Sequence, residues 1–300
     1  MWICPECFME NSANNESCSK CHTIKIDTDP KEKEPTKVEA FAWDQASVKH
    51  NLPVSVNLRK HISIKRDDHS QHIYSCIKIG NTLLFTDFIN KRLIICNAYG
   101  TDIHDIPLSY SPYAITQIDS NTVAVSCKGK IILKIDISTC SITNEITTSR
   151  ESFGISYYDN NLYIVIDRCL MHVMDLPSEE KRTIPSPLEH IVDITVDKNR
   201  MVIIERTSIY CCSLDGTQIW KTKKDNLEDF HSVTTDDEQN VYVTNFKKNN
   251  VLVISDDGEH YRELFTDLNE LKDPWGIYFD KKDKILLVCN DHDAFLFDVR

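Results

Sequence analysis

The stretch Gly80-Asn81-Thr82-Leu83-Leu84-Phe85 is a polar turn followed by a short apolar run, and the same pattern recurs along the chain. Its further copies are Ser120-Asn121-Thr122-Val123-Ala124-Val125, Asn160-Asn161-Leu162-Tyr163-Ile164-Val165, Lys198-Asn199-Arg200-Met201-Val202-Ile203, Gln239-Asn240-Val241-Tyr242-Val243 and Asp283-Lys284-Ile285-Leu286-Leu287-Val288. Six copies at a period of about 40 residues are typical of the blades of a β-propeller. No 3.6-residue apolar period separates the copies, which argues against a helical solenoid. The sequence therefore predicts an all-β, six-bladed β-propeller.

Each repeat has room for four short strands separated by polar turns. In the fifth repeat the expected strands are 232–235, 241–244, 251–255 and 261–264, whereas the sixth repeat stops after a third strand at 294–299. A β-rich stretch at residues 54–64 precedes the first repeat. If it paired with the last repeat as an outer strand, it would close the ring and cover an exposed sheet edge. We therefore expect residues 53–300 to form one closed propeller.

The repeats resemble NHL repeats more than WD repeats. Asp273-Pro274-Trp275-Gly276-Ile277-Tyr278-Phe279-Asp280 follows the NHL opening P-x-G-I-x-x-D, and Phe153-Gly154-Ile155 keeps part of it. Two segments, 245–253 and 87–95, are similar to the D-x-x-N-x-R-I-x-V part of the repeat, and no Trp-Asp pair ends a strand. The propeller thus resembles the C-terminal domain of tripartite-motif NHL proteins.

Four cysteines near the N-terminus stand in two Cys-x-x-Cys pairs separated by ten residues: Cys4, Cys7, Cys18 and Cys21. Two such knuckles give the closed tetrahedral Cys4 shell of a structural zinc, with Zn–S distances of about 2.3 Å. The alternatives are free or disulfide-bonded cysteines and, for the segment 18–22, a c-type haem attachment site. The first cysteine pair and the absence of a secretory leader disfavour the haem site. We expect one structural Zn2+ in a finger at residues 1–24.

The spacing around these cysteines resembles the Ran-binding protein 2-type zinc finger. Trp2 lies two residues before Cys4, and Asn11 lies four residues after Cys7. The resemblance implies that Trp2 packs over the knuckles and that the Asn11 side chain braces the turn. A RING or B-box would need further ligands soon after Cys21, yet the next cysteine is Cys76.

Relatives of this finger divide into those that bind single-stranded RNA and those that bind ubiquitin. The RNA readers carry an arginine pair at positions that here are Asn14 and Asn15. The ubiquitin binders carry Thr-Phe directly after the second cysteine, where this chain has Phe8 and Met9. These two apolar side chains are candidates for contact with a partner, although they could equally cover the metal site. The comparison favours a small protein surface, with ubiquitin as one candidate.

Residues 25–52 form a charged, proline-broken stretch without periodicity, which is typical of a flexible linker. Phe41 and Trp43 interrupt it and could dock on a partner or pack on the next domain. No segment has the length and apolar character of a membrane span, and the chain begins without a signal peptide. We expect no membrane association and a cytoplasmic protein, with a nuclear location as the alternative. The formal net charge of −12 disfavours general binding to phosphate backbones.

No sequence motif indicates catalysis. The chain has no glycine-rich phosphate loop, no G-x-S-x-G and no H-E-x-x-H. The segments His69-Ser70-Gln71-His72 and Asp291-His292-Asp293 are better explained as polar loops than as metal sites. We therefore expect a zinc-binding interaction adaptor, not an enzyme, whose finger and propeller each bind a protein or peptide. An enzyme with a site in the propeller channel is a remote alternative.

An RNA-binding regulatory protein is the main alternative to the adaptor. An RNA-binding propeller needs one basic face. The basic clusters here fall into two sets of turns on opposite faces: Lys91, Arg92, Lys247 and Lys248 between second and third strands, and Lys198, Arg200, Lys281, Lys282 and Lys284 between first and second strands. The division of the clusters makes RNA the less favoured partner.

Chelation of zinc tests the separation of the two modules. Because all four predicted ligands precede residue 22, a chelator should release about one zinc per chain and leave the melting temperature of the propeller unchanged within roughly two degrees. Metal analysis and calorimetry measure the two effects. Collapse of the large domain upon chelation would contradict the assignment.

Overall fold

The structure is a computed structural model that describes residues 2–3, 10–11, 52, 54–65, 70–184, 188–223, 228–265 and 271–300. Contacts divide the chain into two units, Met1–Ala46 and Ser47–Arg300. In the first unit β1 (Trp2–Ile3) pairs antiparallel with β2 (Glu10–Asn11), and Trp2 lies opposite Asn11. The predicted zinc ligands Cys4, Cys7, Cys18 and Cys21, the candidate contact residues Phe8 and Met9, and the predicted linker 25–52 apart from Leu52 lie outside the described residues.

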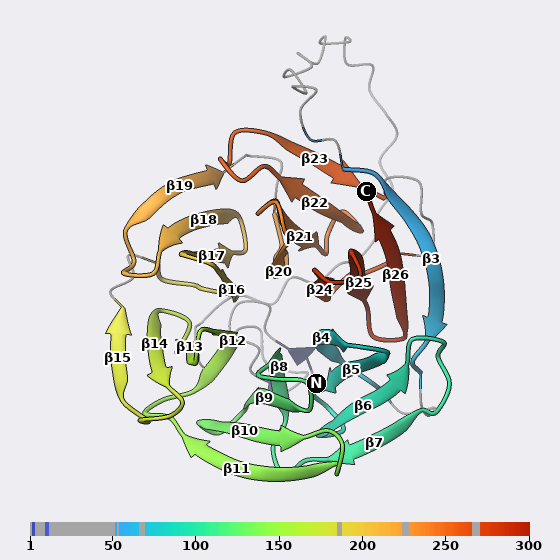
Figure 1. The fold of residues 1–300 in the computed structure, drawn as a ribbon, viewed down its shortest axis with the longest axis vertical. Helices are drawn as coiled ribbons and strands as arrows, with labels where there is room; N and C mark the ends of the chain where they lie inside the picture. Colours follow the sequence, from blue (N-terminus) through green and yellow to red (C-terminus); the bar gives the residue numbers. More distant parts are fainter. Residues whose placement is uncertain are drawn as a thin grey trace. The chain divides into compact units, whose positions relative to one another are not determined.

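The second unit is a six-bladed β-propeller in which each blade is a four-stranded antiparallel sheet (Figure 1). The innermost strands, which surround the centre of Figure 1, are β4 (Ile73–Ile79), β8 (Pro112–Gln117), β12 (Ser152–Tyr158), β16 (Asp193–Asp197), β20 (Phe230–Thr235) and β24 (Gly276–Asp280). The second strands are β5 (Thr82–Asp87), β9 (Thr122–Cys127), β13 (Asn161–Ile166), β17 (Arg200–Glu205), β21 (Val241–Asn245) and β25 (Ile285–Cys289). The third strands are β6 (Arg92–Asn97), β10 (Ile131–Asp136), β14 (Leu170–Asp175), β18 (Ser208–Ser213), β22 (Asn250–Ile254) and β26 (Asp293–Val299). The outer strands are β7 (His104–Pro107), β11 (Ser141–Thr147), β15 (Lys181–Ile184), β19 (Gln218–Lys223), β23 (Tyr261–Leu264) and β3 (Val56–Ser63).

The ring is closed by a strand from the beginning of the propeller. β3 pairs antiparallel with β26, from Val56 opposite Val299 to Ser63 opposite Asp293. Two backbone hydrogen bonds between Ser55 and Arg300, at 2.8 and 2.9 Å, extend the pairing by one residue. The sixth blade therefore runs β24-β25-β26-β3, which confirms the prediction that residues 54–64 supply its outer strand.

The core consists of six apolar clusters, each between two adjacent blades. Second strands contribute most to it because both of their faces are covered by neighbouring blades, so they are apolar almost throughout. Between blades 1 and 2, for example, Leu84 and Ile77 belong to the same cluster as Val123 and Val125. This double coverage explains why the recurrent apolar runs identified the fold.

Hydroxyl groups also connect adjacent inner strands around the channel. The side-chain oxygens of Thr116, Ser156 and Thr234 accept backbone N–H groups of Tyr157, Val196 and Phe279 in the next blade, at 3.1, 3.0 and 3.1 Å respectively. Buried backbone N–H groups need a partner, and here the neighbouring blade supplies it. Much of the polar surface of the channel is therefore used to hold blades together.

The cysteines of the propeller are free thiols: Cys76, Cys96, Cys127, Cys140, Cys169, Cys211, Cys212 and Cys289. Six of them are buried, as expected for small apolar side chains in strands. Over the described part of the chain there is no helix that is long and apolar enough to span a membrane.

Ring closure can be tested with two truncations. Removal of residues 1–52 retains β3, and this protein should fold and melt cooperatively. Removal of residues 1–66 takes β3 away and exposes the edge of β26, so the shorter protein should aggregate and lose its cooperative transition. Gel filtration and calorimetry compare the two, and equal behaviour would show that the pairing of β3 with β26 contributes little.

Candidate functional site

Six equivalent positions near the start of the inner strands form a ring that we call the neck: Ser75, Ala114, Gly154, Asp193, Ser232 and Gly276. Space at the neck is tight. A Cβ atom on Gly276 would lie 2.8 Å from Cys289 Sγ and 3.1 Å from the backbone N of Cys76 in the next blade. A Cβ atom on Gly154 would lie 3.1 Å from Cα of Asp193. Close approach of adjacent blades therefore selects small residues, and Asp193 is the exception.

Four inner strands carry a register shift at the neck, between residues 73 and 76, 112 and 115, 152 and 155, and 230 and 233. Such a bulge interrupts the ladder and re-aims side chains. In three of these blades a second-strand hydroxyl replaces the lost ladder partner: Thr86, Ser126 and Thr244 accept the N–H groups of Ser75, Ala114 and Ser232 at 3.0, 3.1 and 2.9 Å. The same hydroxyls donate to backbone carbonyls of the next blade, at Tyr113, Phe153 and Trp275.

The residues immediately before the neck positions are aromatic in five of the six blades. Together with two phenylalanines from turns between second and third strands, they form a surface that we call the aromatic mouth: Tyr74, Phe88, Tyr113, Phe153, His231, Phe246 and Trp275. Its ring centroids lie 5.0 Å apart for Tyr113 and Phe153, 5.9 Å for Tyr74 and Tyr113, and 5.3 Å for Tyr74 and Trp275. These contacts cross blade boundaries, so the bulges bring together rings from most of the propeller.

Two arginines from neighbouring blades reach the aromatic mouth. Arg168, in the turn between β13 and β14, places its Cζ 4.3 Å from the centre of the Phe153 ring. Burial lowers the pKa of Arg168 and the positive charge of Arg206 adds to this effect, whereas Tyr113, Tyr74 and the Glu151 carboxylate act in the opposite direction. Burial raises the pKa of Tyr74 to about 12, although the charges of Arg168 and Arg206 act in the opposite direction. Arg168 thus contacts the mouth through Phe153, and Arg206 contacts it through His231, whose Nε2 lies 3.3 Å from Nη1 of Arg206.

Arg206 belongs to a small network in blades 4 and 5. Its Nη1 donates to Asp229 Oδ1, and His231 Nε2 lies 3.4 Å from the same oxygen. Burial lowers the pKa of His231 in spite of the carboxylate beside it. Burial acts to raise the pKa of Asp229, but the hydrogen bond from His231 and the charge of Arg206 bring it below its usual value. The network fixes the position of Arg206 at the edge of the mouth.

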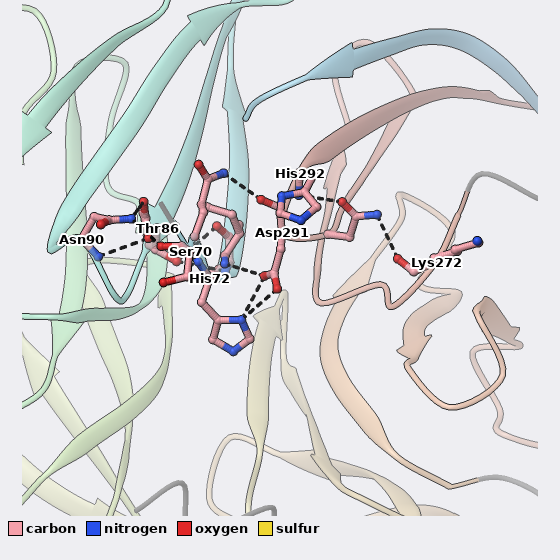
Figure 2. Close-up of polar contacts among 12 residues, drawn as sticks. Ser70, His72, Thr86, Asn90, Lys272, Asp291 and His292 are labelled. Carbon is pink, nitrogen blue, oxygen red and sulfur yellow. Dashed lines mark hydrogen bonds and ion pairs between the residues drawn. The ribbon is translucent and has the colours of Figure 1, made fainter. Parts of the chain in front are cut away.

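A second histidine–carboxylate pair connects blade 1 with blade 6. Figure 2 shows His72 directed toward Asp291, and its Nδ1 lies 3.0 Å from Oδ1 of that carboxylate. Asp291 Oδ1 also accepts the backbone N–H of Ile73 at 2.9 Å. His72 packs edge-on against Trp275, and His231 packs edge-on against the same ring. Trp275 itself is only 8% exposed.

Below the neck, the six inner strands enclose a channel of about 450 Å³. Its far end carries charged side chains that are already paired. Lys281 Nζ lies 2.5 Å from Asp197 Oδ2, and the buried Lys78 bonds to Asp280 and Asp283 at 2.5 and 2.6 Å. Because three of its hydroxyls bond across blades and these charges are paired, we take the aromatic mouth, not the channel, as the candidate site.

The structure gives a mixed outcome for the polar loops singled out in the sequence. His69 lies outside the described residues, whereas His72 and Asp291, from the two separate loops, pair with each other. Asp291 was expected to face solvent from a hairpin turn, but its carboxylate contacts His72 of the neighbouring blade. Among the described residues, metal-ligand spacing is found for Asp257, Glu259 and His260, in the exposed turn after β22. The basic clusters do lie at opposite ends of the blades, in turns as predicted except for Arg92 and Arg200, which begin β6 and β17.

The aromatic mouth was missed in the sequence. Its members are spread from residue 74 to residue 275, and nothing in local spacing connects them. A signal exists once the repeats are aligned, because an aromatic residue precedes a small residue and an aliphatic one in Phe153-Gly154-Ile155, His231-Ser232-Val233 and Trp275-Gly276-Ile277. Tyr113-Ala114-Ile115 follows the same pattern, and Tyr74-Ser75-Cys76 differs in having a cysteine in place of the aliphatic residue.

No protein-family model matches the chain, and no curated protein matches it. Solved structures do resemble it. A protein of unknown function from Bacteroides thetaiotaomicron superposes with a TM-score of 0.68 at 13% identity, over 82% of this chain and 76% of that one. Virginiamycin B lyase from Staphylococcus aureus superposes with a TM-score of 0.61 at 13% identity, over 81% of this chain and 99% of that one. At this identity the likeness supports the propeller fold alone.

Asp193 predicts a measurable pH dependence of stability. Burial raises the pKa of its carboxyl to about 6, despite hydrogen bonds from Ser232 and two backbone N–H groups. An unfolded aspartate titrates near pH 3.9, so between about pH 4 and pH 6 the native state holds a proton that the unfolded state has lost. The free energy of unfolding must then fall as the pH rises, by on the order of 2–3 kcal/mol.

Replacement of Asp193 by Asn removes this pH-dependent contribution to the free energy of unfolding. Urea unfolding should therefore show that the wild type loses about 2–3 kcal/mol relative to Asp193→Asn between pH 4 and pH 7. Asp159→Asn, at an exposed turn, is the matched control. A constant difference between wild type and Asp193→Asn at both pH values would contradict the assignment.

Proposed function

We propose that the protein is a zinc-binding interaction adaptor, in which the propeller binds a protein or peptide at the aromatic mouth and the finger binds a second partner. The observation that carries the proposal is the mouth itself. Half-buried rings and two guanidinium groups converge there on a rigid scaffold, and sites of this composition are typical of macromolecular recognition. The exposed Ile89, which follows Phe88, extends the apolar surface outward.

Charge pairing supports the adaptor over RNA binding. Members of both basic clusters are held by carboxylates: Arg92 by Asp87 and Asp105, Lys247 by Glu228, Lys248 by Glu263, and Lys281 by Asp197. Such cations would release few counterions upon binding a phosphate backbone. Some rings of the mouth pack edge-on against one another, as Tyr74 does against Phe88 and Trp275, so the faces of these rings do not form a continuous stack for bases.

A catalytic function is the second candidate, because two histidine–carboxylate pairs flank Trp275. General-base catalysis needs a histidine nitrogen that a substrate can reach. His231 is buried among Asp229, Arg206 and Trp275, with its side chain 5% exposed. This burial supports a positioning role for the histidine, and we propose that the protein is not an enzyme.

The proposal for the finger depends on its donor set. Four thiolates at Cys4, Cys7, Cys18 and Cys21 suit one structural Zn2+, and the pairing of β1 with β2 is compatible with a hairpin that carries the first knuckle. We propose a finger of the Ran-binding protein 2 type, with Phe8 and Met9 toward a protein partner such as ubiquitin, and a propeller of the NHL type. Free thiols throughout the propeller support a cytoplasmic or nuclear location.

The propeller's role can be tested by peptide selection against the full chain. The affinity of the selected peptides should fall at least about tenfold upon Phe88→Ala or Phe246→Ala, because each change removes buried contact area at the mouth. Ile142→Ala and Ile219→Ala remove exposed apolar side chains on outer strands and serve as controls. Binding that depends on the outer-strand residues and is unchanged by the mouth variants would refute the proposed site.

The finger's partner class can be tested with a fragment of residues 1–26 loaded with zinc. Between Trp2 and Thr23 the cationic side chain is Lys20, set against Glu6, Glu10 and Glu16, so no salt-dependent binding to single-stranded RNA is expected. Weak ubiquitin binding, lost when Phe8 and Met9 are both changed to Ala, should appear in titrations followed by NMR. Tight RNA binding that falls steeply with salt would overturn the assignment.

A further inference from the structure

A cysteine and a histidine from neighbouring blades meet at the protein surface. Cys140 ends the turn between β10 and β11 in blade 2, and His104 begins β7 in blade 1. Sγ of Cys140 lies 3.8 Å from Nε2 of His104, and both residues are exposed. We call this pair the surface dyad. Because it lies at turns between third and fourth strands, it is at the end of the blades opposite to the aromatic mouth.

The histidine of the surface dyad is oriented by the backbone. Its Nδ1 lies 3.0 Å from the carbonyl oxygen of Asp102, which can only accept a hydrogen bond. In the neutral imidazole Nδ1 therefore carries the proton, and Nε2 presents its lone pair to the thiol. The S–H group of Cys140 has a second acceptor in the carbonyl oxygen of Ile137, 3.7 Å away. A thiol within reach of a base that a third group orients has the arrangement of an activated nucleophile.

Exposure sets Cys140 apart from most other thiols of the propeller. Six cysteines are buried, and burial raises the pKa of Cys96 and Cys212 to about 11 and that of Cys127 to about 12. Cys169 is half-buried. A thiol reacts as its thiolate, and the reagent must be able to reach the sulfur. Cys140 meets both requirements, since it is exposed and has a base beside it.

We propose that Cys140 is a site of reversible modification by low-molecular-weight disulfides, with His104 as the base and acid of the exchange. The thiol passes its proton to Nε2 of His104, and the thiolate sulfur attacks one sulfur of the reagent. The S–S bond of the reagent breaks as the new S–S bond to Cys140 forms, and the departing thiolate takes the proton back from Nε2. The sulfur of Cys140 is oxidised and the departing sulfur is reduced, so the step needs no further oxidant.

Disulfide exchange on the full, zinc-saturated chain tests the proposal. The probe is bis(2-hydroxyethyl) disulfide at pH 7, a neutral reagent that surface charge neither attracts nor repels. Digestion and mass spectrometry follow each cysteine separately, so the adduct at residue 140 is distinguished from any on the finger. In the wild type Cys140 should form the mixed disulfide faster than Cys169, and a small thiol added afterwards should remove it.

Variants assign the reactivity to the surface dyad. An ordinary thiol is only a few per cent thiolate at pH 7, and a more stable thiolate is a weaker nucleophile, so His104→Gln should slow the exchange at Cys140 about fivefold. His190→Gln, at an exposed histidine between β15 and β16, is the matched control and should leave the rate unchanged. Thermal melting verifies that each variant is folded.

Two results would overturn the proposal. Equal rates at Cys140 in the wild type and in His104→Gln would show that the histidine does not assist the exchange. Modification of Cys169 ahead of Cys140 would show that the surface dyad is not the preferred site. The second comparison is made within the wild-type chain, so the test remains valid if His104→Gln is not folded.

Discussion

The close approach of six sheets around one axis is the constraint on which the rest of this structure depends. Where the inner strands meet, a methyl group at Gly276 would lie 3.1 Å from the backbone N of Cys76 in the next blade. Small residues at the neck let the blades approach, and hydroxyls such as Thr86 and Thr244 bond both to their own blade and to the next. The bulges that accompany this arrangement direct the preceding aromatic side chains to one end of the channel.

The chemistry of the mouth follows from this packing. Rings that must fill the end of a closed channel exclude water, and the arginines that reach them lose hydration. Arg168 compensates in part by stacking on Phe153, and Arg206 does so by pairing with Asp229. The result is that two guanidinium groups lie beside aromatic rings that come from five blades. At the far end of the channel, Lys78 and Lys281 are likewise paired with carboxylates.

Local patterns in the sequence predicted the structural features that depend on residues close together in the chain. The period of the apolar runs identified six blades, and the β-rich stretch at 54–64 predicted the strand that closes the ring. The cysteine spacing predicts a zinc site in the same way, since four ligands within 18 positions need no tertiary information. The mouth could not be predicted so directly. Its rings come from residues 74 to 275, and their convergence depends on bulges and on turns whose geometry the sequence does not display.

The contacts of the charged residues Asp291 and Arg168 could not be predicted from local sequence either. Asp291 was expected to face solvent from a hairpin turn, but the ring brings His72 of blade 1 within 3.0 Å of it. Arg168 occupies an ordinary-looking turn, Asp167-Arg168-Cys169, and its contact with the Phe153 ring appears only in the folded blade. The decisive neighbour of Asp291 lies in another blade, and that of Arg168 lies on another strand of the same blade, so no local rule covers either contact.

Hydrogen exchange of the full chain with and without bound peptide tests the central claim most directly, which is that the partner occupies the aromatic mouth. The account predicts slower exchange in the turns 88–91, 167–169, 206–207 and 246–249, which surround the mouth, and unchanged exchange in the turns 80–81 and 281–284 at the opposite end of the blades. Protection confined to the opposite turns or to the outer strands would contradict it.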